Sequence, residues 1–166
     1  MASSASWWAS RTRQFRAHLR ARVAPAERAA LEAWTSTGQR ALFDSMHIAD
    51  RRHGLDVVAS LRADGVTEPD VLIAGLLHDA GKGGTGVGPR VAYTLGQRYG
   101  TWVWDVVAVV PGWRAALARL RTHAETSAVL AAAAGCSTRT IGLIRNQDAP
   151  TDPEFGELLR LADEAN

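Results

Sequence analysis

Seven consecutive apolar residues, Val71–Leu77, constrain the fold of this chain more than any other feature. The segment Glu68-Pro69-Asp70 precedes them, and proline favours the first turn of a helix. A helix over this run is apolar on every face, so other elements have to cover it on all sides. We therefore expect it to lie at the centre of a single hydrophobic core.

The rest of the chain has the periodicity of helices and not of strands. Alanine and leucine dominate, apolar positions recur three and four residues apart, and alternation of β-branched residues is nearly absent. The predicted helices cover residues 25–34, a segment around 42–43 after a break at Gly38, 51–62 with Asp50 as N-cap, 69–77, 91–99, 102–110, two helices that flank Thr122, 138–144 with Ser137 as N-cap, and 154–165, with a glycine-rich loop at 81–89. Because 166 residues suit one core, we predict an all-α, single-domain helical bundle over residues 25–166.

Residues 1–24 form a basic segment ahead of this domain. They contain no acid, and before residue 30 only Glu27 balances six arginines: Arg11, Arg13, Arg16, Arg20, Arg22 and Arg28. We expect a helical arm whose arginines are solvated; weak contact with nucleic acid or an anionic membrane is the alternative.

Two features bear on the compartment. The longest apolar run with its flanks, around Val106–Val110, is broken by Asp105 and Pro111 and falls well short of the ~20 residues that span a bilayer. Cys136 is the only cysteine, which excludes an intramolecular disulfide and a thiolate metal site. We expect a chain without a transmembrane segment, located in the cytoplasm.

Polar residues that could carry chemistry occur at the end of the central apolar helix. Burying an uncompensated carboxylate there would cost several kcal/mol, so the pair His78-Asp79 needs a partner. His53 shares a helical stripe with Val57 and Leu61, and Asp163 shares one with Phe155 and Leu159, so both are predicted to point inward. Two imidazoles and two carboxylates that converge favour a divalent cation such as Mn, Fe, Co, Ni, Zn or Mg.

These residues resemble the HD-domain metal-dependent phosphohydrolases. The resemblance consists of His53, then His78-Asp79 within Leu76–Lys82, then Asp163 within Leu161-Ala162-Asp163, in the order H, HD, D, and it covers roughly residues 40–166. It implies an all-helical core, one or two divalent metals between helices, and hydrolysis of phosphomonoesters or phosphodiesters, often of nucleotides.

The sequence departs from that family where two-metal members add histidines between the doublet and the final Asp. His123 is one candidate, but the segment Ile144–Asp148 contains no histidine. We therefore expect a mononuclear site, with His123 as a packing or supporting residue. Asp148 is the alternative to Asp163, which lies near the end of the chain where helices fray.

Lys82 is the only lysine in the chain and follows the doublet directly. Its ammonium could hold a phosphate oxygen and stabilise charge that develops during transfer; the alternative is a cation that interacts with the helix end. Arg51 and Arg52, next to His53, are candidates for the same anion pocket, or are simply solvated.

The sequence thus favours an enzyme in which His53, His78, Asp79 and Asp163 bind a metal, while Lys82 and Arg52 bind a small phosphorylated substrate, such as a nucleotide. The alternative is a catalytically silent module that binds metal and nucleotide for regulation, because the sequence offers no evident general acid. A homo-oligomer is compatible with either function.

Overall fold

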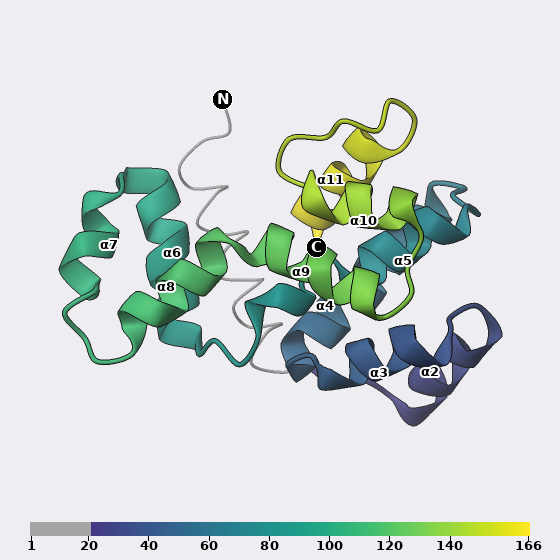
Figure 1. Ribbon diagram of the computed structural model, residues 1–166, viewed down its shortest axis with the longest axis horizontal. Helices are drawn as coiled ribbons and strands as arrows, with labels where there is room; N and C mark the ends of the chain where they lie inside the picture. Colours follow the sequence, from purple (N-terminus) through teal and green to yellow (C-terminus); the bar gives the residue numbers. More distant parts are fainter. Residues whose placement is uncertain (1–20) are drawn as a thin grey trace.

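The computed structural model describes residues 21–166, and this part of the chain is all-α, as predicted (Figure 1). It contains no strand. Its elements are α2 (Pro25–Ala30), the 3-10 helix η1 (Leu31–Ala33), α3 (Thr37–Ser45), α4 (Ile48–Ala63), α5 (Pro69–Leu77), the 3-10 helix η2 (Ala80–Lys82), α6 (Val87–Tyr99), α7 (Trp102–Val107), α8 (Trp113–Arg121), α9 (His123–Ala133), α10 (Thr138–Arg145) and α11 (Gly156–Ala165).

Helix α5 is the buried centre of the molecule, which confirms the prediction from its apolar run. Every residue of Val71–Leu77 is buried. Helices α4 and α10 make its largest contacts, and α3 and α11 add smaller ones. The inward stripe predicted for α4 is also confirmed, because Val57 and Leu61 are fully buried against this core.

The start of helix α4 differs from the sequence prediction for a local reason. Helix α4 begins earlier, at Ile48, because the His47 side chain accepts a hydrogen bond from the Ala49 amide. Asp50 is therefore not the N-cap; it lies in the first turn, buried, and pairs with Arg90. Ser137 does cap α10, since its hydroxyl accepts from the Thr140 amide at 3.1 Å.

Helix α11 begins at Gly156, two residues later than predicted. The Asp152 carboxylate accepts hydrogen bonds from the amides of Glu154 and Phe155, which form a turn instead of the first helical residues. Arg139 of α10 holds the same carboxylate at 2.9 Å and keeps its pKa near 2. This anchor directs α11 back across α4 and α5.

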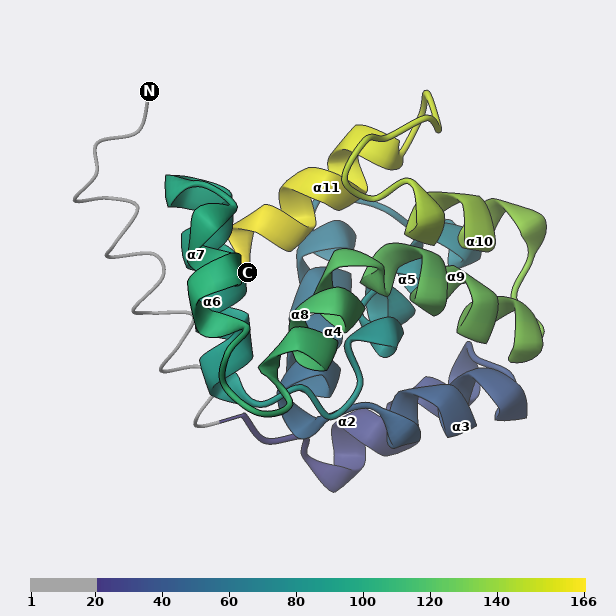
Figure 2. The ribbon, with the colours of Figure 1, turned by 60° about the vertical axis from the view of Figure 1, so that its left-hand side comes forward.

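Helices α6, α7 and α8 form a lobe to one side of these core helices (Figures 1 and 2). The predicted loop at 81–89 is shorter than expected, because η2 and the start of α6 leave only residues 83–86 without helix. The lobe contacts the remainder of the chain mainly where α8 meets η2 and α9.

Residues 1–20 of the predicted arm lie outside the described part of the chain, and residues 21–24 are not helical. None of the described helices combines the length and the apolar character needed to cross a membrane.

A glycine permits the closest approach between α4 and α5. A Cβ atom on Gly54 would lie 2.5 Å from the carbonyl oxygen of Leu76, a distance that backbone atoms do not tolerate. Gly54 follows His53 in the chain, and Leu76 precedes His78 by two residues. The spacing of the two helices therefore sets the distance between the two histidines.

We predict that Gly54→Ala lowers the free energy of unfolding by about 1–3 kcal/mol, because the new methyl group forces α4 away from α5. Gly142→Ala in α10 is the matched control, since its Cβ would meet no atom within 4 Å. That substitution should raise stability by up to about 1 kcal/mol through helix propensity. Chemical denaturation measures both values, and equal effects would contradict the close contact.

Candidate metal centre

The doublet His78-Asp79 lies where α5 ends in the core. His78 is the C-cap of α5, and its ring nitrogen Nδ1 lies 2.9 Å from the Gly75 carbonyl oxygen. Since a carbonyl can only accept, Nδ1 carries the proton and donates it, which directs Nε2 away from the helix. The side chains of His78 and Asp79 are 3% and 2% exposed.

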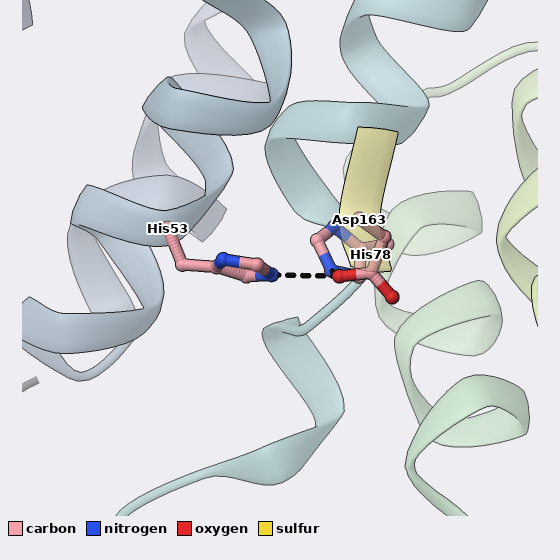
Figure 3. A group of neighbouring side chains, drawn as sticks. All are labelled: His53, His78 and Asp163. Carbon is pink, nitrogen blue, oxygen red and sulfur yellow. Dashed lines mark hydrogen bonds and ion pairs between the residues drawn. The ribbon is translucent and has the colours of Figure 1, made fainter. Parts of the chain in front are cut away.

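Two further helices bring His53 and Asp163 to this point. Asp163 Oδ1 lies 2.7 Å from His53 Nε2 and 3.2 Å from His78 Nε2 (Figure 3). One ligand atom from each of the three residues lies within 4.8 Å of the others, so the group could hold a metal ion. The inward positions predicted for His53 and Asp163 thus converge, from α4 and α11.

Asp79 lies near the same nitrogen of His78 but is not part of this three-residue group. Its Oδ1 is 3.4 Å from His78 Nε2, and its Oδ2 is 4.0 Å from His53 Nε2. Among the described residues, His78 Nε2 and Asp79 Oδ1 are both buried without a hydrogen-bond partner. With Nε2 unprotonated, these two adjacent buried atoms would each offer a lone pair to a cation.

The charges at the site also favour a cation at this position. Burial opposes protonation of His78, but the carboxylates of Asp79 and Asp163 outweigh it and raise the pKa of His78 to about 9. Burial likewise opposes ionisation of Asp163, yet His78 and His53 hold its pKa well below the usual range. A divalent ion at Nε2 would supply the positive charge that these carboxylates stabilise.

Lys82, in η2, lies directly against the doublet. Its Nζ donates a hydrogen bond to Asp79 Oδ2 at 2.6 Å. Burial disfavours the charge on Lys82, but Asp79 compensates and the pKa of the lysine is raised, so it is a cation at neutral pH. The structure therefore places Lys82 beside the candidate metal ligands, where it also neutralises part of the Asp79 charge.

His123, at the start of α9, lies next to this group and is held by its own partners. Nδ1 donates to the Leu120 carbonyl at 2.7 Å, so Nε2 accepts the amide N–H of Gln147 at 3.0 Å. Nε2 is also 3.8 Å from Asp79 Oδ1. Burial and the Lys82 charge lower the pKa of His123, which is neutral at pH 7 and has no proton on Nε2 to donate to Asp79.

The other predicted candidates lie apart from the cluster or are engaged elsewhere. Asp148 is exposed, whereas Asp163 meets both histidines. Arg52 pairs with Glu27 at 2.6 Å and with Asp56 at 2.9 Å. These carboxylates neutralise its guanidinium charge, which is therefore not free to bind a phosphate. Arg51 is half-buried beside it.

Two supporting residues are not evident from the sequence. Arg90 of α6 binds both carboxylate oxygens of Asp50, at 2.5 and 2.7 Å, and its Nε donates to the Thr85 carbonyl at 3.0 Å. This clamp fixes the loop after Lys82 to α4. Gln147 lies in the segment Ile144–Asp148, where the resemblance predicts a histidine, but only the tertiary structure reveals its contact with His123.

The residues of the cluster differ in exposure. His78 and Asp79 form the buried inner part, whereas the side chains of Asp163 and Lys82 are 41% and 24% exposed. Solvent therefore reaches Asp163 and Lys82, whereas His78 and Asp79 are enclosed by protein.

Comparison of the chain with protein-family models, with curated proteins and with solved structures finds no match. The resemblance to the HD-domain phosphohydrolases therefore stays a prediction from the motif residues.

We predict that His78→Ala and Asp79→Ala each reduce bound metal to near zero, because either change removes a buried ligand. Elemental analysis of the purified proteins measures the metal content, and stoichiometric metal in both would show that the site is wrong.

Asp163→Asn should weaken metal binding more than the matched change Asp148→Asn, since only Asp163 of these two lies within 3.2 Å of a histidine nitrogen. Equal losses would contradict this assignment.

Proposed function

We propose that this protein is a metal-dependent phosphohydrolase that cleaves a phosphomonoester or phosphodiester, with nucleotides as the favoured substrate class. The observation that carries the proposal is the pair of buried atoms without hydrogen-bond partners, His78 Nε2 and Asp79 Oδ1, with His53, Asp163 and a cationic lysine around them. The order of these residues also resembles the HD-domain family.

In this proposal His53, His78, Asp79 and Asp163 hold one divalent ion. Two imidazoles in the set favour Mn, Fe, Co, Ni or Zn over Mg, which prefers oxygen ligands alone. A bound divalent ion lowers the pKa of water and neutralises phosphoryl oxygens. The further histidine next to this set, His123, already accepts a hydrogen bond from the Gln147 amide through Nε2. We therefore propose a mononuclear site.

The chain's own residues supply orientation and charge. The pKa of Asp79 stays low despite burial, because His78 and Lys82 stabilise its charge, so its Oδ1 is an acceptor that can orient water at neutral pH. The Lys82 side chain is 24% exposed, and its ammonium can hold a phosphate oxygen while charge develops on it. Arg52 is left out of this role because Glu27 and Asp56 bind it.

A second candidate function is a silent module that binds metal and nucleotide. It is favoured by the state of His123, whose lowered pKa and occupied Nε2 leave it without a proton to donate to a leaving group. Such a protein would retain metal but release no phosphate.

The decisive experiment combines each of Mn, Fe, Co, Ni, Zn and Mg with aryl and alkyl phosphates, phosphodiesters and nucleotides. Phosphate release or diester cleavage that disappears in Asp79→Asn supports the enzyme, because this change keeps the shape of the side chain and removes its charge. Stoichiometric metal together with nucleotide binding but no turnover supports the silent module. Absence of both metal and turnover contradicts the two functions alike.

We predict that Lys82→Ala keeps its metal content but lowers kcat by roughly 10² to 10³, the effect of removing one charge-stabilising donor. Metal should remain because a cation next to Asp79 opposes metal binding. Lys82→Arg should recover only part of the rate, because the planar guanidinium keeps the positive charge but occupies more space than the ammonium. An unchanged kcat would identify Lys82 as the counter-ion of Asp79 alone, and a loss of metal would show that it orients that carboxylate.

A further inference from the structure

The surface of the α6–α8 lobe carries an apolar stripe that the proposed catalytic function does not use. Six of the nine exposed large hydrophobic residues in the described part of the chain lie between Val91 and Val110. Five of them lie within residues 99–110, at the end of α6, in α7 and in the turn after α7, and we call them the lobe stripe: Tyr99 (49% exposed), Trp102 (62%), Val106 (59%), Val109 (82%) and Val110 (40%).

The opposite face of α7 explains why this stripe stays outside. Trp104 stacks on Tyr93 of α6, with ring centroids 5.3 Å apart, and its Nε1 donates to the Tyr93 carbonyl at 3.1 Å. The packing is so close that a Cβ on Gly96 would fall 1.8 Å from Trp104 Nε1. Helix α7 is thus attached through its inner face, and in Figure 1 it lies farthest from the core helices α4 and α5.

The lobe carries a net positive charge. Residues 87–121 contain five arginines and one acid, Asp105, whereas the whole chain has a net charge of only +2. Within the described residues, the four exposed arginines of the lobe, Arg98, Arg114, Arg119 and Arg121, form no ion pair. Four arginines elsewhere, Arg28, Arg139, Arg145 and Arg160, each bind a carboxylate.

We propose that the lobe docks on an anionic lipid bilayer, with the lobe stripe inserted at the interface and the exposed arginines Arg98, Arg114 and Arg119 against lipid phosphates. Exposed valines next to tryptophan and tyrosine, flanked in the chain by Arg98 and Arg114, match the composition of interfacial membrane segments. A symmetric dimer through the same stripe is disfavoured, because it would bring two lobes of net positive charge together. The inference is independent of the proposed catalytic function.

The test is flotation of the full chain with vesicles of phosphatidylcholine alone or mixed with phosphatidylglycerol. We expect binding to the mixed vesicles, at least several-fold weaker binding to the neutral ones, and weakening by salt. Val106→Ser with Val109→Ser should reduce partition by about tenfold or more, because the inserted apolar surface is lost. The matched control is Val129→Ser with Leu130→Ser in α9, which changes two equally apolar exposed residues outside the lobe and should bind as the wild type does.

Three outcomes would overturn the proposal. Absence of binding to mixed vesicles rejects it directly. Undiminished binding by the Val106/Val109 double variant would assign the membrane contact to another segment, such as residues 1–20. A dimer in light scattering that this double variant dissociates, without vesicle binding, would assign the stripe to a second copy of the chain. Thermal unfolding of both double variants, compared with the wild type, distinguishes a loss of vesicle binding from a loss of fold.

Discussion

The burial of the Asp79 carboxylate is the constraint on which the site depends. Helix α5 is enclosed on all faces, so its end delivers His78 and Asp79 into the core, where an ionised group without partners is strongly unfavourable. Lys82 supplies one positive charge at 2.6 Å, and His78 supplies another when protonated. Asp163 adds a second carboxylate to the same small volume, so one negative charge is left uncompensated when His78 is neutral. A bound cation would compensate this charge without protonation of a ligand.

Close packing between backbones makes this convergence possible. Gly54 lets α4 approach α5, and Gly81 does the same for η2 and α9, since a Cβ there would lie 2.4 Å from the His123 carbonyl oxygen. The amide of Gly81 also donates to the Ser127 hydroxyl at 2.8 Å, which ties the turn that carries Lys82 to the helix that begins with His123. The glycine after His78-Asp79-Ala80 therefore has a packing reason: it brings the lysine turn and α9 to the same side of Asp79.

The sequence predicted those features that follow from burial alone. An apolar run with no polar face has one stable location, so α5 was predictable, and inward stripes on α4 and α11 placed His53 and Asp163 on the correct faces. The partners of the polar side chains were not predictable. Asp50 suits a helix N-cap in sequence, yet it binds Arg90, forty residues away, and Gln147 meets His123 only because α9 and α10 pack side by side. Such polar pairs depend on tertiary distances that periodicity does not encode.

The state of His123 restricts the chemistry available to the proposed hydrolase. General acid catalysis needs a proton whose donor titrates near the working pH. His123 is neutral with its Nε2 engaged by Gln147, and Lys82 has a raised pKa and is bound to Asp79, so neither is suited to protonate a departing alkoxide. Leaving groups that are stable as anions, such as an aryl oxide or the phosphate released from an anhydride, need no such donor. Under the proposed function, phosphoesters with such leaving groups would therefore be cleaved faster than simple alkyl phosphates.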